Sequence, residues 1–151
     1  MPAPTVRIRP ADRADIGDII DIDAEATGLR KVDYWHELFA RYGSARGRQQ
    51  RFFLVALRDE RIVGFIVGET RDWEFGSPPC GWVFGISVRR TERESGVASQ
   101  LLAAICEDFR RTGVTKVRTL LARDDHLVMA FFRSQDMMAA PFIALERDLT
   151  E

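Results

Sequence analysis

The segment from Trp82 to Phe109 constrains the fold more than any other part of the chain. It begins as an apolar strand that ends at Val88, passes through a polar turn, and enters a helix at about Ser95. The apolar residues of that helix recur at helical spacing from Val97 onward and form one continuous stripe. A strand that leads into such a helix predicts an α/β domain with a βαβ crossover.

The chain before this segment predicts one strand and two helices. Residues 5–9 alternate between apolar and basic side chains, as a short half-buried strand does, and Pro10 ends the strand. Asp12 is expected to cap a first helix that ends at Gly28, and Asp33 is expected to cap a second.

A β-hairpin is expected next. Residues 52–57 and 62–68 are apolar runs separated by a polar turn, which is typical of two antiparallel strands. Gly64 and Gly68 weaken the second strand, so we expect a bulge or a close neighbour there. The small and basic residues 43–48, ahead of the hairpin, predict a mobile loop.

The end of the chain predicts three further elements. Residues 116–121 alternate as a strand, residues 125–134 suit a helix, and residues 142–149 suit a last strand. The full order is β-α-α-β-β-β-α-β-α-β, an α/β fold whose mixed central sheet is antiparallel in its N-terminal half and is flanked by helices. With 151 residues, the chain is expected to form a single domain, 1–151.

Charge and cysteine content argue against several classes of protein. A formal net charge of -1 supplies no global field for nucleic acid or an anionic membrane. Cys80 and Cys106 are too few and too isolated for a zinc site or a disulfide framework, and we expect no metal. The N-terminus lacks the apolar stretch of a signal peptide and no segment approaches a membrane span, so a cytoplasmic location is expected.

The turn from Arg93 to Ala98 points to a ligand. The free amides of a helix's first turn, at the positive end of the helix dipole, form a site for an anion. Gly96 and Ala98 leave room for phosphate oxygens, and Arg93 adds a charge-assisted contact. The same residues also suit a helix start that needs small side chains for packing. The turn lacks the glycine pattern of a Rossmann fingerprint and the Gly-Lys-Ser/Thr of a P-loop.

The pattern Arg93-x-x-Gly96-x-Ala98, between Ile86-Ser87-Val88 and Leu101-Leu102, resembles the acetyl-CoA signature of the GCN5-related N-acetyltransferases (GNAT). The resemblance covers nearly the whole chain in element order. It implies splayed parallel strands at the cofactor site, where the strand carrying Ile86 and Val88 pairs with the pantetheine arm. The implied acetyl-CoA-binding residues are Ile86, Ser87, Val88, Arg93, Glu94, Ser95, Gly96, Val97, Ala98, Ser99, Asp125, Phe131 and Phe132.

The same resemblance exposes a departure at the catalytic helix. Many relatives carry there a Tyr that protonates the leaving thiolate, and Phe132 stands at that position. Three explanations stay open. Another donor, such as Tyr34, Tyr42, Ser134 or a water, replaces the Tyr. The thiolate leaves unassisted, since a thiol has a pKa of about 8.5. Or the domain binds CoA without transferring an acyl group.

The candidate catalytic residues are Glu69, Glu74 and Tyr34. Glu69 and Glu74 lie on or just past the strand that borders the splayed one, and a partly buried carboxylate there suits a general base. Both also suit solvated charges near a loop. The acceptor pocket is expected between the first two helices and the loop after Glu69. Aromatic residues gather in these segments, as an acceptor cleft or as core: Tyr34, Trp35, Trp73, Phe75 and Trp82.

The leading functional hypothesis is therefore an N-acetyltransferase that moves acetyl from acetyl-CoA to a primary amine of a small molecule or a protein. The alternative is a catalytically silent acyl-CoA-binding or sensing module, which the missing Tyr favours. Nucleic-acid binding through the Arg-rich segments of residues 41–51 fits poorly with the near-neutral net charge. We expect no membrane partner, and the resemblance is compatible with a homodimer.

Overall fold

The computed structural model describes residues 6–43 and 50–150. It divides the chain into two compact units, residues 1–120 and residues 121–151, and each unit is described by itself. The loop predicted over 43–48 lies outside the described residues beyond Gly43. Within the described ranges, no helix is long and apolar enough to cross a membrane.

The first unit is built on one five-stranded sheet. The sheet has the order β1-β2-β3-β4-β5; its neighbours are antiparallel except for β4 and β5, which are parallel. The strands are β1 (Arg7–Pro10), β2 (Arg51–Arg58), β3 (Arg61–Arg71), β4 (Cys80–Val88) and β5 (Val117–Thr119). The predicted mixed sheet with an antiparallel N-terminal half is confirmed.

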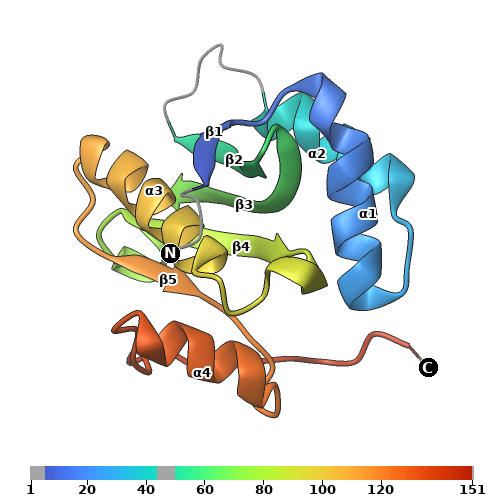
Figure 1. Cartoon of the computed structure of the whole chain (residues 1–151). Coiled ribbons are helices and arrows are strands. Elements are labelled where there is room, and N and C mark those ends of the chain that lie inside the picture. The colour runs from blue at the N-terminus through green and yellow to red at the C-terminus, as the bar shows by residue number, and fades with distance from the viewer. Residues whose placement is uncertain (1–5, 44–49, 151) are drawn as a thin grey trace. The chain divides into compact units, whose positions relative to one another are not determined.

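Three helices cover this sheet on its two faces (Figure 1). They are α1 (Ile16–Thr27), α2 (Val32–Tyr42) and α3 (Val97–Arg111). Short 3-10 turns precede α1, at Arg13–Asp15, and α3, at Arg90–Glu92, and a third, at Glu74–Gly76, lies between β3 and β4. The predicted end of the first helix is confirmed, because Gly28 adopts a left-handed conformation with φ of 79°.

The two faces of β2 and β3 make two apolar layers, because successive side chains of a strand point to opposite sides. Phe53, Val55 and Phe65 pack with the buried residues of α1 and α2. On the other face, α3 lies so close that a Cβ on Gly64 would meet Leu101 at 3.2 Å. The stripe of apolar residues predicted along α3 is therefore its sheet-facing side.

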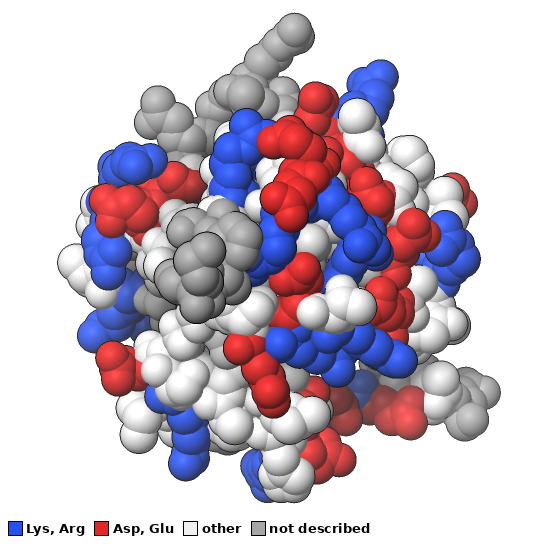
Figure 2. Space-filling view, viewed as in Figure 1, with Lys and Arg blue, Asp and Glu red and all other residues white. Residues whose placement is uncertain are grey.

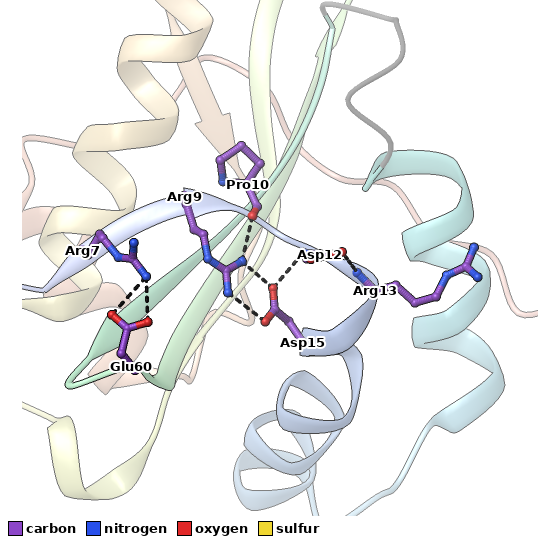
Figure 3. Close-up of polar contacts among 7 residues, drawn as sticks. All are labelled: Arg7, Arg9, Pro10, Asp12, Arg13, Asp15 and Glu60. Atoms are coloured by element: carbon purple, nitrogen blue, oxygen red, sulfur yellow. Dashed lines mark hydrogen bonds and ion pairs between the residues drawn. The ribbon is translucent and has the colours of Figure 1, made fainter.

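The start of α1 is fixed by a set of polar contacts around a buried carboxylate (Figure 3). Asp12 and Asp15 form a capping box, in which the Asp12 backbone N–H donates to Asp15 Oδ2 at 2.7 Å. Arg9 of β1 donates to both oxygens of Asp15, at 2.6 and 3.0 Å. The predicted cap at Asp12 is thus confirmed, with a 3-10 turn between the cap and the helix.

The predicted cap at Asp33 is wrong. The helix α2 begins at Val32, and Lys31 occupies the cap position without a capping side-chain bond. A tertiary contact places this helix start instead. The buried Asp23 accepts a bond from Trp35 Nε1 at 3.0 Å and pairs with Lys31 Nζ at 3.1 Å.

The expected irregularity in β3 is confirmed. The register with β4 shifts between Val67 and Gly68, as a bulge does. A Cβ on Gly68 would lie 2.5 Å from the carbonyl oxygen of Trp82, so this position accepts only glycine without movement of the backbone. The bulge lies next to the place where β4 leaves β5.

The second unit contains one helix, α4 (His126–Ser134), as predicted. The Asp125 side chain caps it by accepting from the Val128 N–H at 3.1 Å. The strand predicted over residues 142–149 is wrong, since these residues have no strand ladder and are exposed. A strand needs a partner for its backbone groups, and no other described segment supplies one. Asp148 instead bonds locally to Thr150.

Candidate active site

The central feature of the site is a fork between β4 and β5. The two strands pair only over Gly81–Val83 of β4, where Thr119 Oγ1 donates to the Val83 carbonyl at 2.8 Å. From Phe84 to Val88, β4 keeps its antiparallel partner β3 but has no strand on its other edge among the described residues. A free strand edge offers N–H and C=O groups to an extended ligand.

The direction of the backbone groups on this edge follows from one hydrogen bond. Just past β4, the Arg89 N–H donates to Val63 of β3 at 2.8 Å. Successive residues of a strand point their N–H groups to opposite sides, so those of Val88 and Ile86 point away from β3. These are the two residues whose backbone the sequence resemblance assigns to the pantetheine arm. Their assignment to that arm stays a prediction.

The free edge leads into the exposed start of α3. Gly96 is the cap residue of this helix, with φ of 85°, and no side chain at the cap position bonds to the first turn of the helix. A Cβ placed on Gly96 would meet nothing within 4 Å. The preceding Glu94 also has a positive φ, 64°. Left-handed residues ahead of a helix start are typical of turns that bind anions through backbone N–H groups.

The turn that precedes α3 is held by Arg89, which the sequence reasoning did not single out. Its guanidinium donates to the Ile62 carbonyl at 2.8 Å and to Asp18 of α1 at 3.1 Å. The next residue, Arg90, donates its backbone N–H to Glu25 at 2.6 Å. Basic residues beside a phosphate loop suggest ligand contacts, but these two bond to α1 and to the sheet.

Two neighbouring charged residues behave differently. Glu92 is tied to the sheet through Arg58, with 2.9 Å between Arg58 Nε and Glu92 Oε2. Arg93 is exposed, and its side chain makes no hydrogen bond or ion pair within residues 6–43 and 50–150. Arg93 is therefore the basic residue of this turn that is available to an anion.

A second cluster, made of Tyr42, Glu69 and Phe84, lies beside the fork. The Tyr42 hydroxyl donates to Glu69 Oε2 at 2.9 Å, and Arg71 Nε lies 3.4 Å from Glu69 Oε1. The Tyr42 ring contacts Phe84 edge-on, with 5.3 Å between centroids. Burial, followed by the hydrogen bond to Glu69, raises the pKa of Tyr42 above its ordinary value. The phenol is therefore protonated at neutral pH.

The structure separates the other two predicted catalytic residues from this cluster. Tyr34 lies on α2 eight residues before Tyr42, which is about 12 Å along a helix. It contacts Trp35, and Lys31 Nζ lies 5.6 Å from its ring centroid. Glu74 is exposed in a short turn between β3 and β4. Of the three predicted catalytic residues, only Glu69 is placed beside the fork.

The turn that carries Glu74 also presents two exposed aromatic residues. Trp73 and Phe75 both have left-handed backbones, with φ of 51° and 50°, and are 65% and 109% exposed. Such a conformation costs about 1 kcal/mol or more for a residue with a Cβ, and it recurs at functional sites. The remaining predicted aromatic residues are divided, because Trp35 is buried in the core and Trp82 lies under Arg71.

The predicted cofactor residues of the second unit belong to α4. Asp125 is its cap, and Phe131 and Phe132 contact each other with 5.1 Å between ring centroids. Phe132 is buried, and its side chain has no proton to donate. These three assignments stay predictions. In the described part of the chain, no group of three or more His, Cys, Asp or Glu residues could hold a metal ion.

Comparison with known proteins decides the family. Residues 17–137 match the model of the Acetyltransferase (GNAT) family. The chain belongs to this family. The predicted membership of the GNAT superfamily is therefore confirmed, and with it the prediction of an acetyltransferase enzyme.

Solved GNAT structures show the same fold at low sequence identity. The chain matches the aminoglycoside N-acetyltransferase AAC(6')-Iy, solved in complex with CoA, with a TM-score of 0.82 and 18% identity over 99% of both chains. It matches the aminoglycoside 6'-N-acetyltransferase AAC(6')-IG of Acinetobacter haemolyticus with a TM-score of 0.76 and 20% identity, over 96% of this chain and 99% of that one.

One curated relative is closer in sequence but matches over a shorter length. The L-2,4-diaminobutyric acid acetyltransferase of Nocardia farcinica (strain IFM 10152) is 32% identical over 79 residues. The match spans 52% of this chain and 39% of that relative.

Proposed function

We propose that this chain transfers an acetyl group from acetyl-CoA to a primary amine of a small molecule, with Glu69 as the general base. One observation carries the proposal: the free edge of β4 leads through a turn into the start of α3, where Gly96 is the cap residue. An extended amide-containing arm that ends in a pyrophosphate matches this pair of features. A strand edge takes the arm, and a helix start takes the phosphates.

For acetyl-CoA, the proposed contacts follow from the backbone directions. The pantetheine arm pairs with Ile86 and Val88, and the turn from Arg93 to Ala98 holds the pyrophosphate, without the amides of Arg93 and Ser95, which donate to the carbonyls of Arg90 and Glu92. Since the phosphates lie beyond Val88, the arm runs back along β4 toward Phe84. Four strand residues cover about 13 Å. The thioester end is therefore expected at the fork, next to the cluster of Tyr42, Glu69 and Phe84.

Glu69 is the candidate base because of its place and its exposure. It lies at the end of β3, with a side chain 22% exposed, so it reaches solvent and the fork alike. An amine must lose a proton as it attacks the acetyl carbon, and a carboxylate in reach of that nitrogen takes it. Glu74, on the exposed turn, is better suited to contacting the acceptor than to removing its proton.

The acceptor that we propose is a small molecule with more than one amino group. The relatives named above act on an aminoglycoside or on diaminobutyric acid, both of which carry several amines. The turn of residues 72–76 offers a fitting surface. It presents the carboxylates of Asp72 and Glu74 beside the exposed rings of Trp73 and Phe75. Carboxylates and aromatic faces both attract ammonium groups.

The test is a thiol-release assay with acetyl-CoA and a panel of diamines, amino sugars and lysine peptides. We expect release of CoA thiol with at least one small polyamine and slower release with peptides. Turnover on peptides alone would contradict a small-molecule acceptor. Tight CoA binding without turnover on any amine would support the alternative, a silent acyl-CoA-binding module, which the presence of Phe132 favours.

The CoA site has its own test in Gly96→Glu. The new side chain places a negative charge where the pyrophosphate is proposed, so we expect CoA affinity to fall at least about 100-fold by calorimetric titration, as for an opposed charge worth ~3 kcal/mol. Gly113→Glu is the matched control, because Gly113 also has a left-handed backbone, φ of 92°, and open space for a Cβ. Equal CoA affinity in the two variants would refute the placement.

Two further properties belong to this proposal. A homodimer is supported by exposed apolar residues at the end of the second unit, where Ile143, Leu145 and Leu149 are 83%, 87% and 87% exposed. A cytoplasmic location is supported by the two free thiols, Cys80 and Cys106. Light scattering on the eluting protein tests the first, and cell fractionation tests the second.

A further inference from the structure

The Tyr42 hydroxyl is bonded to the carboxylate that we propose as the base. It donates to Glu69 Oε2 at 2.9 Å, and both side chains are partly buried. The pair joins two elements far apart in sequence, the last residue of α2 and the end of β3. A phenol and a carboxylate in this contact can exchange a proton without moving.

The position of the pair places it near the fork. The Tyr42 ring contacts Phe84, which is the first residue of β4 beyond the segment paired with β5. Phe84 is 39% exposed, so the ring contact reaches the open side of the strand. The pair therefore faces the point where the proposed path of the pantetheine arm ends.

Acid strengths show what each member of the pair can do. A thiol, with a pKa of about 8.5, is a stronger acid than a phenol, at about 10, so a thiolate does not take the phenol's proton readily on its own. A carboxylic acid, at about 4.3, is far stronger than both. A phenol whose bonded carboxylate has just been protonated is a competent donor, because its proton is replaced as it leaves.

We propose that Tyr42 and Glu69 act as one proton relay, in which Glu69 takes the proton of the attacking amine and Tyr42 delivers a proton to the departing thiolate. The inference rests on the proposed function. Tyr42 would then fill the role that Phe132 cannot.

The steps balance within the pair. The amine nitrogen forms a bond to the acetyl carbon, and the carbon–sulfur bond breaks with its electrons on sulfur. The amine proton moves to the Glu69 carboxylate, and the phenolic proton of Tyr42 moves to the sulfur. The acid proton of Glu69 then moves to the phenolate. The products are an amide and a free thiol, and both side chains return to their starting states.

The charges around the pair decide how it titrates. Arg51 of β2 lies over the Tyr42 ring, with 5.0 Å to the centroid, and Arg41 precedes Tyr42 on α2. Arg71 on β3 contacts Glu69. The two arginines near the ring favour a phenolate electrostatically, whereas Glu69 opposes it. The guanidinium groups would therefore stabilise the phenolate during the transfer.

The first experiment measures the coupling between Tyr42 and Glu69 in the free protein, without any turnover. The chain has two tyrosines, so carbon-13 labelling of the tyrosine ring gives two signals, and Tyr34→Phe assigns them. We expect Glu69→Gln to lower the pKa of Tyr42 in the free protein, because the opposing charge and the hydrogen bond to a carboxylate are lost. An unchanged titration of Tyr42 in Glu69→Gln would overturn the coupling on which the relay depends.

The second experiment measures turnover with an accepted amine. We expect Tyr42→Phe to lower kcat about 100-fold, at the lower end of the range for a lost acid or base, with CoA affinity and folding retained. A kcat of Tyr42→Phe within twofold of the wild-type kcat would overturn the relay and leave the proposed function standing. A comparable fall of kcat in Tyr34→Phe, with kcat retained in Tyr42→Phe, would instead assign the role of proton donor to Tyr34. A wild-type chain without turnover on any amine would overturn the proposed function and the relay together.

A third measurement separates proton donation from positioning. In Tyr34→Phe, Tyr42 is the only tyrosine, so biosynthetic incorporation of a difluorotyrosine changes the acidity of that phenol alone. We expect the basic limb of the kcat profile to move to lower pH together with the pKa of the fluorinated phenol. A profile that does not move would mean that Tyr42 only positions Glu69, which contradicts the proposed delivery of the proton.

Discussion

At the scale of single residues, the buried charges are explained by specific partners. Asp15 and Asp23 are buried carboxylates, 5% and 8% exposed. Arg9 bonds to the first, and Trp35 and Lys31 bond to the second. A buried carboxylate without partners would be protonated or would destabilise the fold. Each of these residues therefore fixes the position of a helix start as well as being tolerated there.

Asp15→Asn tests the contribution of the Arg9 pair. We expect the free energy of unfolding at pH 7 to fall by about 1–3 kcal/mol, because Arg9 loses a charged partner while the amide oxygen still accepts from Asp12. Asp21→Asn is the control, since its ion pair with Arg30 is exposed and worth under about 1 kcal/mol. Equal effects of the two substitutions in denaturant unfolding would contradict the prediction.

The same site predicts a pH dependence. Burial by itself would raise the pKa of Asp15, but the bonds from Arg9 and from the Asp12 N–H outweigh it and leave the pKa lowered. A lowered folded-state pKa stabilises the protein above the unfolded value of about 3.9, and the stabilisation is lost as the pH falls through the folded value. The stability difference between wild type and Asp15→Asn is therefore expected to shrink below pH ~4. If the free energies of unfolding of wild type and Asp15→Asn differed by the same amount down to pH ~2, this would be evidence against the ion pair of Arg9 and Asp15.

At the scale of elements, close packing of backbone against backbone shapes the sheet. The bulge at Gly68 brings the Trp82 carbonyl of β4 within 2.5 Å of any Cβ at that position, and Gly81 is equally close to the Phe109 ring. The two glycines differ in what would have to move. At Gly68 the obstacle is the Trp82 carbonyl, which is backbone, and at Gly81 it is a side chain on α3.

Gly68→Ala is expected to destabilise the protein by about 1–3 kcal/mol, as overpacking at a rigid site does. Gly17→Ala is the matched control, because Gly17 lies in α1 with nothing within 4 Å of its Cβ and gains up to about 1 kcal/mol from helix propensity. Thermal unfolding of both variants measures the contrast. A stabilised Gly68→Ala would mean that the bulge is not fixed by this contact.

Periodicity alone predicted most elements correctly. The continuous apolar runs of β2 and β3 and the apolar stripe along α3 are local patterns that reflect which faces are buried, and these elements were predicted within a few residues. The start of α2 was missed because Asp23, distant in sequence, fixes it through Trp35 and Lys31. The strand predicted over 142–149 was wrong because a suitable pattern does not supply a partner strand.

Some features of the candidate site were likewise predictable from the sequence, and others were not. The turn before α3 was predictable, since small residues at a helix start are visible in the sequence, and its role in binding an anion stays a prediction. The pair of Tyr42 and Glu69 was not, because no spacing relates the end of α2 to the end of β3. Nor could the sequence show that Arg89 and Arg90 bond to α1 while Arg93 remains exposed.

At the scale of the whole molecule, charge is balanced rather than concentrated. Basic and acidic side chains are interspersed over the face seen in Figure 2, and the formal net charge is -1. Such a surface does not attract one sign of ligand from a distance. An anionic cofactor bound at the site that we propose would therefore be recognised by short-range contacts rather than by a long-range field.

The segment 142–149 predicts an uneven pattern of hydrogen exchange. Residues 143–149 belong to no strand ladder in the described structure, so we expect their amides to exchange at nearly the rate of an unfolded chain, whereas those in the centres of β2 and β3 are protected. Exchange followed by mass spectrometry measures both. Strong protection of 142–149 that weakens on dilution would instead show that these residues pair with a second copy.

The free edge of β4 has a consequence for how the protein survives in a cell. A ligand that pairs with Ile86 and Val88 extends the sheet as an additional strand would. Because such a ligand binds only the folded chain, its binding is coupled to folding. A hundredfold excess of CoA over its Kd would add about 2.7 kcal/mol to the stability of the folded chain. A starved cell, with its CoA pool depleted, would therefore hold a less stable and more rapidly degraded population of this protein, and its abundance would follow the metabolic state.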